Sequence, residues 1–408
     1  MRRLICVLSF ATACGSGAHA RPDAAGSASS DASSDAAGSS SDLGALMPRE
    51  VAGDAHAVMA TPTVVAITYD ADPNRDDIEA LYTQYAASPA WTMQTAEYGI
   101  GALAVGTPRH LGGTAATSDA QVRQLLTANL GGTSPAWGAP NEDTLYSVTI
   151  PVGTAFTDQT GASFCGGYHD DFMIGTVDVA YAIQLPCTLP PPVTALQSLT
   201  FALSHELVEG VTDPRFETDY AWGDVDPAHE VWAYVTDGEL ADMCEFASTW
   251  LWTDAPGMTY AIQRIWSNAA AHAGTDPCVG DPTAPYAQSV PDQPDATTIA
   301  LFGGSVSTNA TKVAIGATGS ITVHVAGTGP GPFTVTAYDV ATLYFDASKP
   351  LLTFTQPTGS YHVGDTVTIP VTVVAKDANL GGAGAEAFEI DTAPASGPTT
   401  YFYGLVSQ

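Results

Sequence analysis

The sequence predicts an α+β domain that is followed by a smaller β-sandwich. Three observations support this prediction. The chain has 408 residues, which is longer than one compact domain usually is. Hydrophobic residues make up 45% of it, enough to bury a substantial core. The composition also changes near residue 290: all seven Trp and all six Cys precede that point, and a Thr- and Val-rich stretch without either type follows it.

The first 46 residues have the layout of a targeting signal and a tether. Arg2 and Arg3 precede a short apolar run, and small residues before Cys14 resemble a bacterial lipoprotein signal. We therefore expect a signal peptide over 1–13, with Cys14 lipidated or, alternatively, with plain secretion. Residues 14–46 are almost entirely Ser, Ala, Gly and Asp, which predicts a flexible tether. The protein is thus expected in the cell envelope, lipid-anchored or secreted.

The charge of the chain excludes one class of partner. The sequence contains 43 Asp and Glu but only 12 Lys and Arg, which gives a net charge of −31. A protein that binds nucleic acid or an anionic membrane surface needs clustered cations. We therefore expect no nucleic-acid partner, and contact with a membrane only through the lipid anchor.

Four cysteines remain after the signal region, and they predict two disulfides. Four cysteines allow three pairings. Sequence order favours Cys165–Cys187 and Cys244–Cys278, which close loops of about 20 to 35 residues and contribute about 3 kcal/mol each in the chain-entropy model. No CxxC pair occurs, so a thiolate zinc site or thioredoxin-type chemistry is not expected.

Residues 47–289 are predicted to form the α+β domain, because this segment mixes helical and strand periods. Ser118 and Gln121 have the spacing of a capping box at the start of one helix. Gly210 stands where a second helix would end. The expected strands are 64–69, 145–151 and 181–185, and the expected helices are 76–87, 118–130 and 194–209.

Residues 297–408 are predicted to form an accessory β-sandwich without a catalytic group. Apolar and polar side chains alternate at 320–325, 333–338 and 366–374, and clusters of Gly, Pro and Asp separate these runs. Short strands at this spacing are typical of an immunoglobulin-like sandwich. The Pro- and Asp-containing segment 290–296 is the expected linker between the two domains.

The residues best suited to chemistry lie on the helix expected at 194–209, in the sequence His-Glu-Leu-Val-Glu. Residues four apart share one face of a helix, so His205 and Glu209 point in the same direction, with Glu206 beside them. Further along the chain, Glu239 and Asp242 stand one turn apart if that stretch is helical. The predicted disulfide at the nearby Cys would hold that stretch in position.

This arrangement resembles the zincin metallopeptidases, in particular the glutamate-zincin branch, in which a helix carries HExxH and a later helix supplies a Glu ligand. The resemblance implies a zincin-like fold that cleaves extracellular peptides. It implies zinc bound by His205, Glu209 and Glu239, with Glu206 as the general base and Asp242 orienting a ligand His. Glu209 stands where the family has its second His, and the additional carboxylate would make the bound ion a poorer Lewis acid.

The same residues also suit a harder metal ion. His205, Glu209 and Asp213 follow one another at intervals of four, and with Glu239 they offer mostly oxygen donors, which calcium and manganese prefer. His169, beside the first predicted disulfide, is a further candidate for the site. The remaining interpretation is a structural helix with its His in the core and its Glu side chains in solvent.

The order of features is also similar to the plant EXORDIUM, or phosphate-induced, protein family. The shared features are a strand ending at Tyr69, an aromatic patch at Trp91, Cys165 followed by Gly and His, and a helix leading into Val211-Thr212-Asp213-Pro214. Members of that family are secreted to the cell wall. This resemblance implies the alternative function, a non-catalytic surface protein that binds a cell-wall ligand such as a polysaccharide.

Overall fold

A computed structural model gives the fold of the chain. It describes residues 43–53, 58–187, 189, 192–215, 221–278, 285–301, 304–345, 347–376 and 385–408. The predicted signal peptide, the lipidation site Cys14 and most of the predicted tether lie outside this range. The last four residues of that predicted tether form a short helix, α2 (Leu43–Leu46). Within the described ranges, no helix has the length and apolar character needed to cross a membrane.

The chain has a mixed α+β fold that is rich in strands. Its first half is built on a sheet with strand order β3-β2-β5-β7-β6, in which β4 also pairs with β2. The strands pair in parallel except for β6, which runs antiparallel to β7 at one edge. The bounds are β2 (Thr63–Tyr69), β3 (Ala104–Val105), β4 (Arg109–Leu111), β5 (Thr144–Thr149), β6 (Gly166–Ile174) and β7 (Val177–Leu185).

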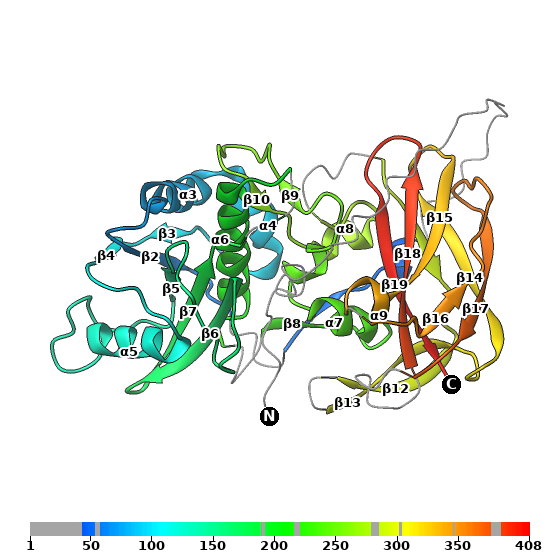
Figure 1. Cartoon of the computed structure of the whole chain (residues 1–408). Helices are drawn as coiled ribbons and strands as arrows, with labels where there is room; N and C mark the ends of the chain where they lie inside the picture. Colours follow the sequence, from blue (N-terminus) through cyan, green and yellow to red (C-terminus); the bar gives the residue numbers. More distant parts are fainter. Residues whose placement is uncertain are drawn as a thin grey trace.

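Helices cover both faces of this sheet (Figure 1). The apolar side chains of β2 alternate: Val64 and Ala66 pack with α6 and α3, whereas Ile67 packs with α5 on the opposite face. Each face therefore has its own core. The helices and helical turns of this half are α3 (Arg75–Ala87), α4 (Pro89–Thr95), η1 (Ala96–Tyr98), α5 (Asp119–Leu130), α6 (Ala195–Thr212), α7 (Glu230–Thr236), η2 (Asp242–Cys244) and α8 (Asn268–His272).

Helix α6 differs from its prediction at its end. Thr194 and Gln197 form a capping box at its start: the Thr194 hydroxyl accepts from the Gln197 N–H at 3.1 Å, and Gln197 Oε1 accepts from the Thr194 N–H at 2.9 Å. The helix then continues through Gly210, so the predicted stop there is wrong. A Cβ at Gly210 would lie 2.8 Å from Leu145 Cδ1. A larger residue here would therefore require the Leu145 side chain to shift, because α6 passes close to β5.

The predicted capping box of α5 is also wrong. The side chain of Ser118 caps no backbone N–H, although the residue does precede the helix. Gln121 Oε1 instead accepts from the Thr117 N–H at 2.8 Å. The start of α5 is further held by an isolated bridge between Ser118 and Thr157. A tertiary contact has therefore replaced the local cap.

The second half of the chain forms two sheets, β11-β14-β17-β16 and β12-β13-β19-β18-β15. Their facing side chains share one hydrophobic core, which includes Ile321 and Val335. The predicted linker 290–296 contributes to two strands, since β11 ends at residue 291 and β12 begins at residue 295. The bounds are β11 (Ala287–Pro291), β12 (Asp295–Leu301), β13 (Gly304–Lys312), β14 (Thr318–Gly327), β15 (Phe333–Asp339), α9 (Val340–Leu343), β16 (Leu352–Phe354), β17 (Thr366–Val373), β18 (Ala385–Pro394) and β19 (Thr400–Ser407).

The two halves pack directly on each other through α7 and β19. The ring of Trp232 lies 5.6, 5.4 and 4.9 Å from the rings of Tyr401, Phe402 and Tyr403. The hydroxyl of Tyr401 also donates to the carbonyl of Met243 at 2.8 Å. The C-terminal sheets thereby support the segment 230–245. Two further pairs of short strands complete the fold: β1 (Glu50–Ala52) with β8 (Trp222–Val225), and β9 (Leu251–Trp252) with β10 (Ile262–Gln263).

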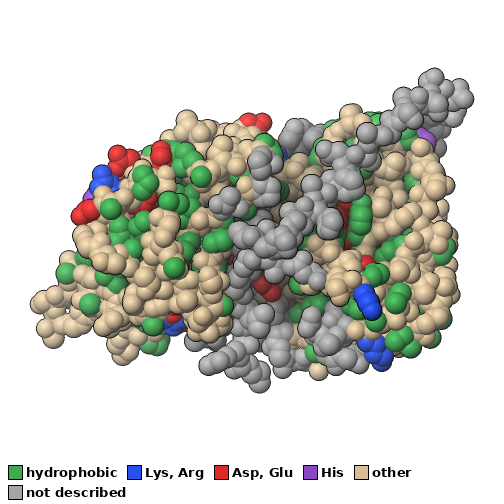
Figure 2. Space-filling view, viewed as in Figure 1, with side chains coloured by type: hydrophobic (Ala, Val, Ile, Leu, Met, Phe, Trp, Pro, Cys, Tyr) green, Lys and Arg blue, Asp and Glu red, His purple; other side chains and the backbone are tan. Residues whose placement is uncertain are grey.

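Both predicted disulfides are confirmed. Cys165–Cys187 joins the start of β6 to the end of β7, and Cys244–Cys278 anchors the segment that follows α7. Such crosslinks are typical of proteins outside the cytoplasm. On the face shown in Figure 2, Lys and Arg side chains are few and scattered, one of them beside acidic side chains, and they form no patch.

Candidate metal centre

Acidic and imidazole side chains from three elements meet beneath the sheet, on the face covered by α6. The central helix α6 supplies three of them, the edge strand β6 supplies one, and the segment from the end of α7 to the first residue of η2 supplies the other two. Each is at most 5% exposed. The members of this cluster, called the metal cluster below, are His169, His205, Glu206, Glu209, Glu239 and Asp242.

His205 is held in one tautomer by a residue that the sequence did not point to. Its Nδ1 is hydrogen-bonded to the side-chain oxygen of Gln263. The Gln263 amide nitrogen donates to the carbonyl of Ala241 at 2.6 Å, so its oxygen must face the ring and accept from Nδ1–H. Nε2 is therefore directed into the cluster, 2.8 Å from Glu209 Oε2 and 3.4 Å from Asp242 Oδ1.

The backbone of Gln263 is fixed as firmly as its side chain. Its N–H donates to the hydroxyl of Ser204 at 2.9 Å, and its carbonyl accepts from the side chain of Gln94 at 2.7 Å. A single Gln in a two-residue strand carries no signal in the sequence. Only the contact between β10 and α6 shows its role.

His169, which the sequence offered only as a further candidate, lies inside the cluster. Its Nδ1 is 3.5 Å from Glu206 Oε2 and 3.9 Å from Glu209 Oε2. Its Nε2 is 3.4 Å from Glu239 Oε1 and 3.2 Å from the carbonyl oxygen of Asp213. The edge strand β6 therefore brings a second imidazole to the helix that carries the first.

The two glutamates of α6 are positioned differently. Glu209 Oε1 accepts from the N–H groups of Ala241 and Asp242, both at 3.1 Å, which leaves Oε2 to face the imidazoles. Neither carboxylate oxygen of Glu206 has a hydrogen-bond partner in the part of the chain that the structure describes. Gly167 lets Glu206 approach β6, because a Cβ at Gly167 would overlap its carboxylate.

Burial and mutual repulsion strongly perturb the acids of the cluster. Burial, followed by the charge of Glu209, raises the pKa of Glu239 and of Asp242 well above the ordinary range. Burial also raises the pKa of Glu206. Burial opposes a charge on His205 as well, but the neighbouring Glu209 and Glu206 outweigh it and raise the pKa of that imidazole. The metal cluster therefore favours a positive charge among its acids, such as that of a protonated His205.

Two further carboxylates lie close to the metal cluster without belonging to it. Asp213, an alternative ligand in the sequence analysis, is buried at the end of α6, and its Oδ1 accepts from the N–H of Ala221 at 2.7 Å. Glu50 of β1 is 3% exposed, and no hydrogen-bond partner of its carboxylate oxygens is present in the described segments. Burial, followed by the charge of Asp224, raises the pKa of Glu50 well above its usual value. Glu50 carries no motif or periodic signal in the sequence.

The metal cluster has the donors and the spacing of a metal site. Two sets of residues each offer three donor atoms that lie within 4.8 Å of one another. The first set is His169, Glu209 and Glu239, and the second is His205, Glu209 and Asp242. Two donors on a tetrahedral zinc ion lie roughly 3.4 Å apart, close to the separations of His205 Nε2 from Asp242 and of His169 Nδ1 from Glu206. Imidazole nitrogen with carboxylate oxygen suits zinc or manganese. The residues that are present therefore fit a divalent ion.

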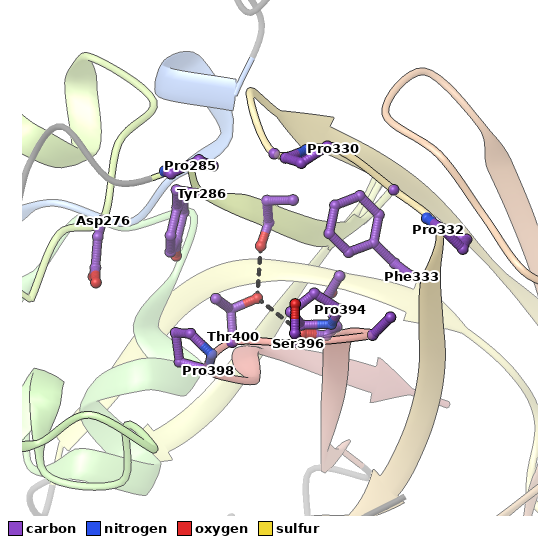
Figure 3. Close-up of a pocket in the computed structure, with 16 residues that line it drawn as sticks. Asp276, Pro285, Tyr286, Pro330, Pro332, Phe333, Pro394, Ser396, Pro398 and Thr400 are labelled. Atoms are coloured by element: carbon purple, nitrogen blue, oxygen red, sulfur yellow. Dashed lines mark hydrogen bonds between the residues drawn. The ribbon is translucent and has the colours of Figure 1, made fainter. Parts of the chain in front are cut away.

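A separate pocket of about 420 Å³ lies on the C-terminal sheets (Figure 3). Proline and aromatic side chains, including Tyr286, Phe333 and Pro394, form much of its wall. Asp276 contributes an acidic group, and burial raises the pKa of that carboxyl to about 6. The pocket contains no residue of the metal cluster, so the two features are separate.

No protein-family model matches the chain, and no curated protein matches it in sequence. Among solved structures, a chimeric titin Z1Z2 carrying a decorin peptide is 11% identical, with a TM-score of 0.17 over 30% of this chain and 95% of that one. A conjugative transposon lipoprotein from Bacteroides eggerthii is 14% identical, with a TM-score of 0.16 over 23% of this chain and 88% of that one. Similarity at this level does not identify a shared fold.

Proposed function

We propose that this protein is a metal-binding protein of the cell envelope, anchored by a lipid at Cys14 or secreted, whose metal cluster holds zinc. One observation carries the proposal. Both carboxylate oxygens of Glu206 and one each of Glu209 and Glu239 are almost fully buried and make no hydrogen bond among the described residues. Two imidazoles face them, the nearest contact being His205 Nε2 to Glu209 Oε2 at 2.8 Å. Burying such oxygens without a partner costs several kcal/mol, and a bound cation removes that cost. Calcium is the alternative ion.

The candidate activity is hydrolysis of a peptide bond in an extracellular substrate. In a one-ion site, His205, Glu209 and Asp242 would hold the ion, because these three offer donors within 4.8 Å of one another, whereas Glu239 groups with His169. The ion would supply Lewis-acid polarisation of the peptide carbonyl. Glu206 accepts the proton of the attacking water, and its raised pKa suits that role. Gln263 keeps Nε2 of His205 directed inward. Within this proposal, residues 47–289 form a zincin-like domain and residues 297–408 an immunoglobulin-like accessory sandwich.

The test is metal analysis of the full-length protein, with His205→Ala beside the wild type. We expect bound zinc in the wild type and little in the variant. The matched control is His324→Ala, which removes a half-exposed imidazole on β14 and should leave metal content unchanged. Glu206→Gln should then abolish cleavage of a peptide library while the fold persists. A wild type without bound metal would refute the proposal.

The burial of the metal cluster favours a second candidate, a non-catalytic surface protein with a structural ion. All six side chains are at most 5% exposed, so a substrate would reach them only after a movement of the chain. The pocket near Tyr286 and Phe333 would then be the ligand site, with aromatic walls that suit a polysaccharide or another cell-wall ligand. In that case Glu206→Gln leaves ligand binding unchanged, and Phe333→Ala reduces it.

A further inference from the structure

We propose that the metal cluster holds two divalent ions, with Glu206 and Glu209 shared between them. This inference rests on the proposed metal binding and changes its stoichiometry and the role of Glu206. The Nε2–H of His169 donates to the carbonyl of Asp213 at 3.2 Å, which leaves Nδ1 as the nitrogen that can bind an ion. The first ion is held by Nδ1 of His169 and by Glu239, and the second by Nε2 of His205 and by Asp242. Each pair consists of one imidazole and one carboxylate.

The spacing of the donors separates these two pairs. An ion with bonds of about 2.1 Å joins donors that are at most about 4.2 Å apart. Within each set of three, all donor atoms lie within 4.8 Å of one another, and no larger set among the described residues meets this limit. One ion therefore cannot contact His169, Glu239, His205 and Asp242 together in this arrangement. Glu209 is the member that both sets share.

The orientation of Glu206 supports a bridge. Its Oε2 faces His169 Nδ1 at 3.5 Å, and its Oε1 faces His205 Nε2 at 3.8 Å. The side chain thus directs one oxygen toward each imidazole, and neither oxygen has a hydrogen-bond partner in the described structure. Carboxylates that bridge two metal ions use their two oxygens in this way. The close approach permitted by Gly167 keeps Glu206 in that position.

Glu209 is shared through a single oxygen. Oε1 is occupied by two backbone N–H groups, so only Oε2 is directed to the imidazoles. That oxygen lies 2.8 Å from His205 Nε2 and 3.9 Å from His169 Nδ1. It therefore stands between the two donor pairs.

The charge of the cluster is consistent with two ions. Four carboxylates meet two imidazoles, and among the described residues the imidazoles are the ion-pair partners of these carboxylates. When the carboxylates are ionised and the imidazoles neutral, one divalent ion leaves two negative charges buried. Two divalent ions balance the cluster, and uncompensated buried charge is costly.

The test is equilibrium dialysis of the full-length, metal-stripped protein against Mn²⁺ and, separately, Zn²⁺, followed by metal analysis. We expect two ions per chain. Glu239→Gln and Asp242→Asn should each bind one, because each removes a ligand from a different pair, and Glu206→Gln should weaken both sites. The control is Glu230→Gln, a buried acid outside both sets, which should still bind two. Electron paramagnetic resonance of the Mn²⁺-loaded wild type should show exchange coupling between the ions.

The outcomes separate this inference from the proposed function. One ion per chain, with an uncoupled Mn²⁺ spectrum, would overturn the two-ion site and leave metal binding intact. Loss of all metal in both single variants, with circular dichroism unchanged, would also show one shared site. Absence of metal from the wild type would overturn the proposed function together with this inference. The wild-type stoichiometry and spectrum decide the matter even if a variant fails to fold.

Discussion

The two faces of the parallel sheet each bury an acidic cluster, but only one of them contains its own cation. On the α5 face, Arg123 Nε lies 2.8 Å from Asp119 Oδ2, and the same guanidinium contacts Asp170. The hydroxyls of Tyr168 and Tyr181 donate to Asp119 Oδ1 at 2.9 and 2.5 Å. On the α6 face, the metal cluster has two imidazoles and no Lys or Arg in its described ion pairs.

Strand β6 contributes to both clusters, because His169 and Asp170 are neighbours that point to opposite faces. The comparison shows how burial of acids serves two purposes. Where a guanidinium is built into the chain, the cluster is complete and stabilises the fold. Where it is not, neutralisation depends on protons or on ions from solution, and such a cluster can hold a cation.

Removing Arg123, the cation of the cluster on the α5 face, should have the largest effect, seen in the stability of the fold. Arg123→Met leaves Asp119 and Asp170 buried without their guanidinium, so we expect a loss of about 3 kcal/mol in the free energy of unfolding. Urea denaturation measures it. Arg75→Met is the control, because Arg75 pairs with an exposed Asp76 and should cost far less. Metal content should not change in either variant. A metal-free Arg123→Met protein would show that the two clusters are not independent.

Removing the hydrogen-bond acceptor that fixes the His205 tautomer should have an intermediate effect, seen in metal affinity. Gln263→Met preserves length but loses the acceptor for Nδ1–H, and the loss of such a partner weakens metal affinity about 10- to 100-fold. Competition with a chromophoric chelator measures the affinity. Gln94→Met is the matched control, since it removes the hydrogen bond to the Gln263 carbonyl without contacting His205. Equal losses in both variants would contradict a specific role for the Gln263 side chain.

The smallest effect concerns pH. Burial, followed by the charges of Asp224 and Asp226, raises the pKa of Glu230 from 4.5 to about 8. The folded state therefore retains a proton that the unfolded chain releases, and stability declines as pH rises from about 4.5 to about 8. We expect the metal-free protein to melt at a lower temperature at pH 8 than at pH 5. Glu230→Gln should reduce the slope. A melting temperature that rises with pH in the metal-free protein would contradict this sign.

Much of the candidate site was predictable from residue spacing within α6. The interval of four between His205 and Glu209 places them on one face of any helix, whatever surrounds it. The pairing of the cysteines followed from their order along the chain, and both disulfides are present. Gly210 was wrongly predicted to end the helix, because a local rule for helix ends takes no account of β5, which lies against α6 at this residue.

Local patterns therefore established the helix that carries the metal cluster, three strands in each half and the disulfides, because each depends on residues close in the chain or on simple order. His169, Glu239 and Asp242 were already candidates from the sequence, but only the folded arrangement places them against that helix and adds Gln263 and Glu50. His169 comes from an edge strand, Gln263 from a two-residue strand, and Glu50 from a segment beside β8. Their distance from α6 in the sequence leaves no periodic signal, since contacts between separate elements depend on how the sheet and its helices pack.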